Sequence, residues 1–267
     1  MTLPVNPAAL RGLYRELQSS AGDRRHLAVD GARELAPLLA RELARGGDPT
    51  AVNMGGLDGA AALVYVLAGA PDESDEQGLR RANRARVPIV CVVAGRAGEP
   101  VRVPYVLATD VVPVPPGAGF PIEAIAEALA ARLGEEGTAL AARLPTLRSA
   151  VCERLIRTCA HRGAIYGAAA FVPGADLPVL LLSQLRLVAR IAAAHGRAID
   201  AKLVPELVAV VGGAFGFRTA ARELVGLVPR FGWAVRGAVA ALGARAVGEA
   251  ALARFRLQRD EAATDVP

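Results

Sequence analysis

Aromatic residues make up only 4 % of the 267 residues, although hydrophobic residues make up 53 %. Ala, Val and Leu therefore supply most of the apolar surface, and helices rich in small side chains can approach one another closely. The chain has three cysteines, Cys91, Cys152 and Cys159, which are too few for a disulfide framework. We therefore expect a reducing compartment.

The sequence also lacks an uninterrupted apolar segment of the roughly 20 residues that a membrane-spanning helix needs. The longest candidate, residues 163–185, is interrupted by Pro173, Asp176 and Pro178. Residues 1–10 have neither the basic start nor the apolar centre of a signal peptide. A short buried hairpin, an interfacial helix and the core of a soluble helical bundle remain as alternatives for residues 163–185.

The net charge of +5 is distributed unevenly. Residues 1–142 carry 14 arginines against 17 acidic residues, whereas residues 143–259 carry 17 basic against 6 acidic residues, a net charge of +11. Residues 260–267 add three negative charges. A basic and apolar half favours an anionic partner, either a membrane surface or a nucleic acid. The low aromatic content argues against nucleic acid.

Residues 1–142 begin with a helical pattern over residues 6–18 and then alternate short apolar runs with longer helical patterns. Strands are predicted at residues 27–29, 51–53, 63–67, 88–93 and 105–107, and helices at residues 34–45, 73–85 and 122–133. This alternation is typical of a mostly parallel sheet with helices on both faces. The sequence therefore predicts a three-layer α/β domain over residues 1–142.

Residues 143–259 carry helical patterns almost throughout. Helices are predicted at residues 144–170, 177–195, 204–211, 219–227 and 233–256, with breaks rich in Gly or Pro between them. The last residues, 260–267, are polar and are expected to form a tail. The predicted fold is thus an α/β domain followed by an apolar, basic, all-α domain.

The order of elements in residues 1–142 resembles the small GTPase-type fold of the P-loop superfamily. Residues 63–67 resemble its strand before the second switch, and residues 89–93 resemble the strand that precedes the guanine-reading Asn-Lys-x-Asp motif. A phosphate-binding loop needs Gly-x-x-x-x-Gly-Lys-Ser/Thr after the first strand, because its amides, lysine and hydroxyl hold the phosphates and Mg²⁺. Residues 30–35 read Asp-Gly-Ala-Arg-Glu-Leu instead, and residues 94–99 contain no guanine-reading motif. We therefore expect a degenerate GTPase-like domain that hydrolyses no GTP.

Two features of this half have both an ordinary and a functional interpretation. Gly31 lies at a possible helix N-terminus and is a candidate for binding one anion, although Asp30 and Glu34 would repel phosphate. An acidic cluster starts the next predicted helix: Asp72, Glu73, Asp75 and Glu76. We interpret this cluster as complementing the helix dipole, with a divalent-metal site as the alternative.

Two stretches of the helical half resemble the signature stretches of the domain-of-unknown-function 697 family, which is related to bacterial inner-membrane proteins of the YcjF type. They are GADLPVLLLSQLRLVARIAAAHGRAI (residues 174–199) and LVPRFGWAVRGAVAALGARAVGEAALARF (residues 227–255). The resemblance covers residues 145–255 and implies a helical domain that follows a GTPase-like domain in a membrane-associated protein. The family's molecular activity is unknown, so the resemblance implies no reaction.

Five basic side chains and a tryptophan are the candidates for contact with a membrane or a partner: Arg186, Arg190, Arg197, Lys202, Trp233 and Arg236. A basic stripe beside apolar residues is typical of a helix on a membrane surface, and a solvated face over a soluble core is the alternative. We expect no metal site, because Cys152 and Cys159 lie about 10 Å apart along a helix axis, which is too far for one ion with thiolate bonds of about 2.3 Å. We also expect no catalytic residue and no cofactor.

The sequence therefore predicts a non-catalytic protein associated with the cytoplasmic side of a membrane. Its helical domain would contact the membrane surface, a membrane protein or another protein partner. The alternative is a soluble cytoplasmic regulator that binds a nucleotide or an anion at Gly31 or at the Gly55-Gly56 turn. A nucleic-acid binder that uses the arginines is a third hypothesis.

Overall fold

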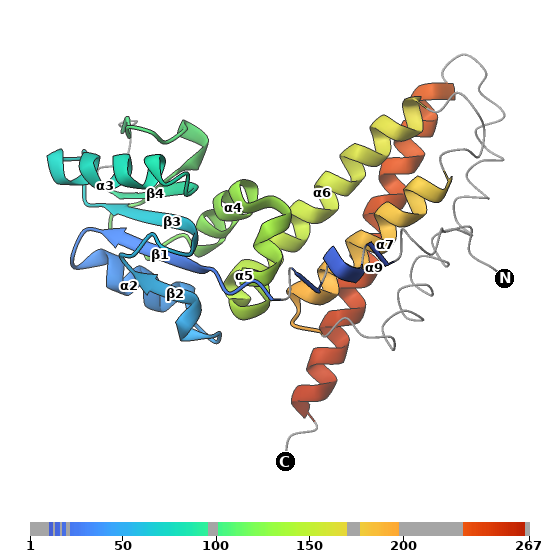
Figure 1. Ribbon diagram of the computed structural model, residues 1–267, viewed down its shortest axis with the longest axis horizontal. Helices are drawn as coiled ribbons and strands as arrows, with labels where there is room; N and C mark the ends of the chain where they lie inside the picture. Colours follow the sequence, from blue (N-terminus) through green and yellow to red (C-terminus); the bar gives the residue numbers. More distant parts are fainter. Residues whose placement is uncertain are drawn as a thin grey trace. The chain divides into compact units, whose positions relative to one another are not determined.

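A parallel five-stranded sheet forms the centre of the first half of the chain in the computed structural model (Figure 1). The structure describes residues 11–12, 14–16, 18–19, 22–95, 101–169, 177–197 and 232–264, without the side chains of 167–169, 177–181, 232–237, 239 and 256–264. The chain divides into two units. Gly22–Arg154 forms the α/β unit, and Met1–Ala21 with Leu155–Pro267 forms the helical unit.

The strands of the α/β unit are β1 (His26–Gly31), β2 (Val52–Met54), β3 (Ala60–Leu67), β4 (Ile89–Ala94) and β5 (Val111–Val114). They lie in the order β2-β1-β3-β4-β5, and every neighbouring pair is parallel. Seven of the eight residues of the central strand β3 are buried. A continuous apolar run of this kind is typical of a sheet covered on both faces. The prediction of an α/β domain with a mostly parallel sheet is therefore confirmed.

Three helices cover the sheet: α2 (Leu35–Leu43), α3 (Glu73–Arg84) and α4 (Ile122–Leu133). Two further helices follow in the chain, α5 (Gly137–Arg143) and α6 (Pro145–Ala169). Leu79 of α3 packs against one face, in a buried cluster with Tyr65 and Cys91. The intervening residues Val64 and Val92 point to the opposite face, because successive side chains of a strand alternate. Both α2 and α4 also contact the strands, and Figure 1 shows α2 across the sheet from α3.

One predicted strand is wrong. Residues 105–107 lie in a turn, and Tyr105 has a φ of 64° that no regular strand adopts. The last strand is β5, in which Val112 and Val114 are buried while Pro113 points outward. A proline is tolerated there because β5 is an edge strand, where one row of backbone amides needs no partner in the sheet.

The described helices of the helical unit are the later part of α6, together with α7 (Leu177–Ala194) and α9 (Gly232–Thr264). Small residues bring α6 close to α9, since a Cβ atom at Gly163 would lie 3.4 Å from the backbone of Ala240, and one at Gly248 would collide with Ile156. The helix α9 continues into the predicted polar tail at 260–267, as far as Thr264, through Glu and Ala, which favour helix. The predicted helices at 204–211 and 219–227 lie outside the described residues. Within the described part of the chain, no helix is both long and apolar enough to cross a membrane.

The two units divide the chain later than the expected boundary at residues 142/143. The start of α6 belongs with the α/β unit, where Leu147 and Val151 are fully buried and Gly137 of α5 contacts Val151. Residues 1–21, expected in the α/β domain, belong to the helical unit.

Candidate functional site

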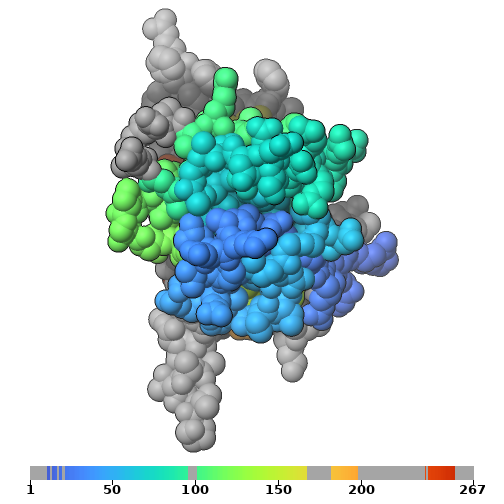
Figure 2. Space-filling model, turned by 90° about the vertical axis from the view of Figure 1, so that its left-hand side faces the viewer, coloured from blue at the N-terminus to red at the C-terminus, as the bar shows by residue number. Residues whose placement is uncertain are grey.

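The carboxyl edge of the parallel sheet is where this fold would be expected to bind a ligand. In open parallel sheets, ligands bind beyond the carboxyl ends of the strands, where the strand order reverses. The order β2-β1-β3-β4-β5 places this reversal between β1 and β3. Figure 2 looks onto this edge, because β1 in Figure 1 points toward the side that Figure 2 turns to the viewer. The residues there are Asp30 and Gly31 at the end of β1.

Backbone amides at this edge already have acceptors inside the protein. The amide of Gly31 donates to the Asp30 carboxylate at 2.8 Å, and the amide of Ala32 donates to the Val66 carbonyl at 2.8 Å. At the start of α2, the amides of Leu35 and Ala36 both donate to the carbonyl of Ala32. A phosphate-binding turn needs such amides free for its ligand. The β1–α2 turn therefore offers an anion few donors and places a carboxylate beside it.

Gly31 itself is explained by packing. Its φ of 110° is strained for any other residue, and a Cβ atom there would lie 2.1 Å from the Val66 carbonyl oxygen, which is a steric clash. At the second glycine candidate, the amide of Gly55 donates to the carbonyl of Val29 at 2.9 Å, and a Cβ atom would meet nothing within 4 Å. Its φ of 67° is a conformation that favours glycine, so packing accounts for Gly31 and backbone conformation accounts for Gly55.

The acidic cluster at the start of α3 is a helix cap. The Asp72 carboxylate accepts from the Asp75 amide at 2.8 Å, and the Asp75 carboxylate accepts from the Asp72 amide at 3.0 Å. Asp75 also accepts from the Tyr65 hydroxyl at 3.0 Å. Burial, and then the carboxylate of Asp75, raise the pKa of Tyr65 above its ordinary value. The interpretation as a cap is confirmed, and no group of three His, Cys, Asp or Glu in the described residues has metal-site geometry.

The three cysteines belong to no metal-binding cluster of the described residues. Cys91 is fully buried in β4, and burial raises the pKa of its thiol to about 12, as expected for a core residue. Cys152 is also buried, and the Sγ atom of Cys159 lies 3.9 Å from the carbonyl oxygen of Ser183.

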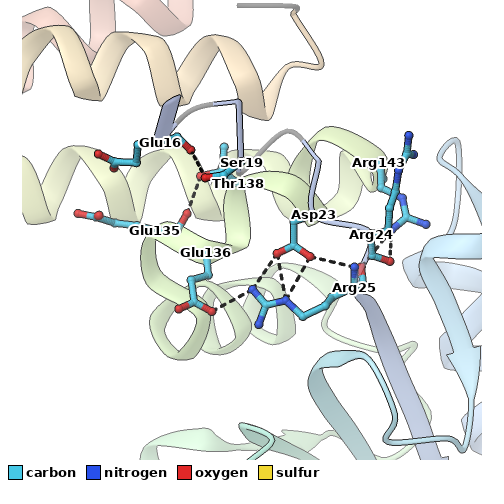
Figure 3. A network of polar contacts seen from close by, with 9 residues as sticks. All are labelled: Glu16, Ser19, Asp23, Arg24, Arg25, Glu135, Glu136, Thr138 and Arg143. Atoms are coloured by element: carbon cyan, nitrogen blue, oxygen red, sulfur yellow. Dashed lines mark hydrogen bonds and ion pairs between the residues drawn. The ribbon is translucent and has the colours of Figure 1, made fainter. Parts of the chain in front are cut away.

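The amino edge of the sheet carries a polar network that joins residues far apart in the sequence (Figure 3). Arg25, which precedes β1, donates to Asp23 at 2.7 Å and to Glu136 at 3.0 Å. Arg143 at the end of α5 donates to the Asp48 carboxylate at 3.0 Å and to the carbonyl of Arg25 at 3.0 Å. The network fastens α5 to the segments that lead into β1 and β2, so its arginines have a structural role.

The carboxylates of this network have lowered pKa values. The side-chain hydrogen bond from Arg25 lowers the pKa of Asp23. Hydrogen bonds from Thr50 and then from Arg143 lower the pKa of Asp48 to about 2. Both groups therefore favour the charged form in the folded protein.

In the helical unit, two arginines of the predicted basic stripe form ion pairs inside the protein. The Glu16 carboxylate pairs with Arg186 at 2.8 Å and also with Arg190, whose side chain is 10 % exposed. Arg197 lies over the ring of Phe255, 5.9 Å from its centre. Three of the predicted contact residues lie outside the described side chains: Lys202, Trp233 and Arg236. The pairing with Glu16 could not be read from the sequence, because 170 or more residues separate the partners.

Sequence reasoning missed an exposed face on α6. Ile165 and Tyr166 are 54 % and 49 % exposed, and the side chain of Arg162 is exposed as well. Residues three and four positions apart lie on the same side of a helix, so these three side chains form one surface, the α6 face. Ile165 and Tyr166 belong to residues 163–185, for which a buried hairpin, an interfacial helix and a soluble core were the alternatives, and the pattern did not show which side chains are exposed.

Comparison with known proteins adds no relative. No family model, curated protein or solved structure matches the chain. The resemblances to a GTPase-type domain and to the domain-of-unknown-function 697 family therefore stay predictions. Within the two signature stretches, residues 174–176, 198–199 and 227–231 lie outside the described residues.

Proposed function

We propose that this chain is a non-catalytic, membrane-associated protein. Its α/β unit is a degenerate GTPase-like scaffold that binds a protein partner, and its helical unit contacts an anionic membrane surface on the cytoplasmic side. The observation that carries the proposal is the α6 face, where two apolar side chains and an arginine are exposed together.

The α6 face has the composition of a membrane-surface contact. Interfacial segments combine apolar side chains that enter the lipid boundary with basic side chains that meet anionic headgroups. Tyrosine is enriched at such interfaces, because its ring is apolar and its hydroxyl is polar. The net charge of +11 in residues 143–259 supports attraction to an anionic surface, even though Glu16 neutralises part of the stripe on α7.

The geometry of the carboxyl edge supports a scaffold over an enzyme. The amides of Gly31 and Ala32, which a phosphate would need, already donate within the protein, and the Asp30 carboxylate stands beside them. The same geometry weakens the alternative of a nucleotide- or anion-binding regulator at Gly31. The strand order is one of two common orders in doubly wound sheets and does not by itself select the GTPase-type fold.

Flotation of the full chain with vesicles tests the membrane proposal. We expect the protein to float with vesicles of 70 % phosphatidylcholine and 30 % phosphatidylserine at low salt and not with pure phosphatidylcholine. The double variant Ile165→Ser/Tyr166→Ser should lose most of this binding. Leu38→Ser/Met54→Ser is the matched control, because Leu38 and Met54 are 51 % and 52 % exposed in the α/β unit.

Binding that is equal on both kinds of vesicle, or absent from both, contradicts the proposal. Equal loss in the two double variants would show that the α6 face is not the contact surface. If the wild type floats only in the presence of a second protein, the helical unit binds that protein and not the lipid.

A further inference from the structure

One side of the α/β unit carries a concentration of arginines that the proposed membrane contact does not use. Three lie on the second half of α3, one follows the helix and one precedes β5: Arg80, Arg81, Arg84, Arg86 and Arg102. All five are exposed, and none of them forms an ion pair with a residue that the structure describes. Residues 1–142 as a whole carry a net charge of −3, so this surface is basic on an otherwise acidic domain.

Exposed apolar groups lie next to these arginines. Residues that precede β5 pass beside α3, where buried Val103 joins the cluster that contains Leu79. Tyr105 and Leu107 remain 49 % and 61 % exposed, and the Nε atom of Arg80 donates to the Tyr105 hydroxyl at 3.2 Å. We call the five arginines with Tyr105 and Leu107 the arginine face.

The backbone of the arginine face is strained. Arg86 and Tyr105 have φ angles of 57° and 64°, and they are the two non-glycine residues with positive φ in the described part of the chain. The amide of Arg86 donates to the Asn83 carbonyl and that of Val87 to the Ala82 carbonyl, which places Arg86 at the helix end where glycine is usual. A side chain at such a position destabilises the fold, and strain of this kind is concentrated at binding sites.

The arginines also repel one another. Arg84 is four residues from Arg80 and three from Arg81, spacings at which like charges on a helix are unfavourable. The helix dipole favours positive charge in the last turn of α3, where Arg81 and Arg84 lie, but it does not account for the exposed Arg86 and Arg102 beyond the helix. Arginine and tyrosine are the residue types most enriched at protein interfaces and among the residues that dominate binding energy.

We propose that the arginine face binds an acidic segment of a partner protein that carries an apolar side chain. The guanidinium groups would pair with carboxylates, which they can do with two hydrogen bonds each, and Tyr105 with Leu107 would receive the apolar side chain. The proposal rests on the scaffold role of the α/β unit and gives that role a surface and a partner chemistry.

Charge along α3 favours a short acidic segment over a long polyanion. Asp72 and Glu73 begin the same helix, and Asp72 lies about 12 Å along the axis from Arg80. A nucleic acid that followed the helix would meet these carboxylates within one or two phosphates. A short peptide can end before them.

Fluorescence anisotropy with the full chain tests the proposal. The probe is a fluorescein-labelled peptide of twelve residues, Glu-Glu-Leu-Glu repeated three times. We expect saturable binding, weakened at least tenfold in Arg80→Glu/Arg84→Glu and severalfold in Leu107→Ser. The control Arg33→Glu/Arg41→Glu makes the same change of charge at two exposed arginines of the same unit and should bind within twofold of the wild type. Circular dichroism at each step establishes that the variants are folded.

Several results would overturn the proposal. Absence of peptide binding at millimolar concentration is one, and equal weakening in the two double variants is another, since it would reflect net charge alone. A twenty-nucleotide poly-dT that binds more tightly than the peptide and loses binding in Arg80→Glu/Arg84→Glu would assign the surface to nucleic acid. Light scattering that shows a wild-type dimer and a monomeric Arg80→Glu/Arg84→Glu would assign it to a second copy. None of these results depends on vesicle flotation, so the membrane proposal stands or falls separately.

Discussion

Two polar groups at the edges of the sheet, the Arg143 side chain and the Gly31 amide, have partners inside the protein, whereas the arginines of the arginine face form no ion pair with a described residue. Arg143 at the amino edge donates to Asp48 and to the carbonyl of Arg25, and the Gly31 amide at the carboxyl edge donates to Asp30. On α3, Arg84 forms no ion pair with a described residue. The difference shows that the number of arginines in a region does not reveal their role. The partners of each side chain do.

A substitution at the carboxyl edge should cause the largest loss in the free energy of unfolding. Gly31→Ala would place a Cβ atom against the Val66 carbonyl oxygen at a φ of 110°, so β1 and β3 would have to separate. We expect a loss of more than about 3 kcal/mol in the free energy of unfolding, measured by urea denaturation. Gly46→Ala is the control, because its φ is 67° but nothing lies within 4 Å of the added atom. A loss no larger than that of the control would mean that Gly31 is not held by packing.

The amino edge should respond more strongly than the arginine face. Arg143→Ala removes hydrogen bonds to Asp48, Thr50 and two backbone carbonyls, so we expect a loss of about 2–3 kcal/mol in the free energy of unfolding. Arg84→Ala should change it by less than about 0.5 kcal/mol. Similar losses in the two variants, measured by the same urea titration, would remove the distinction between the two regions.

Acid should reduce the stability that the polar network at the amino edge contributes. Because Asp23 and Asp48 have lowered pKa values in the folded protein, their stabilisation is complete above the unfolded value of about 3.9 and is lost as the pH falls toward about 2, the folded pKa of Asp48. The melting temperature of Asp48→Asn should therefore fall less between pH 6 and pH 3 than that of the wild type. The control Asp58→Asn, at an exposed turn, should keep the wild-type pH dependence. An unchanged pH profile in Asp48→Asn would exclude this contribution.

The smallest effect has the opposite sign and lies on the arginine face. Arg86→Gly removes a side chain from a left-handed position and should raise the free energy of unfolding of the α/β unit by about 0.5–1 kcal/mol. The same variant should bind the acidic peptide more weakly. A stable variant with weaker binding would identify the strain as a cost of function, while lower stability would indicate that Arg86 supports the fold.

The sequence predicted the elements that depend on local pattern. The apolar runs located β1, β3 and β4, and helix periodicity located α4 with its observed ends. Residues 105–107 were misread, because Tyr-Val-Leu has the composition of a strand, and the pattern does not show that Val103 anchors this segment beneath α3.

The roles of the arginines were less predictable. Arg143 pairs with Asp48 across 95 positions and Arg190 with Glu16 across 174, so folding decides which arginines are used internally. Gly31 was proposed as an anion site because it starts a helix, and only the neighbouring strand β3 reveals its packing role. The α6 face was hidden in a helix whose periodicity does not distinguish an exposed apolar side chain from a buried one.

Titration calorimetry of the full chain tests most directly whether the carboxyl edge is closed and the α/β unit acts through its outer surface. GTP, ATP and inorganic phosphate, each with Mg²⁺ and at millimolar concentration, are the ligands. We predict no saturable heat for any of them, because the amides of Gly31 and Ala32 already have acceptors and Asp30 stands beside them. Saturable binding of a nucleotide that is strengthened in Asp30→Lys and unchanged in Arg80→Glu/Arg84→Glu would place the nucleotide at the carboxyl edge and contradict this account.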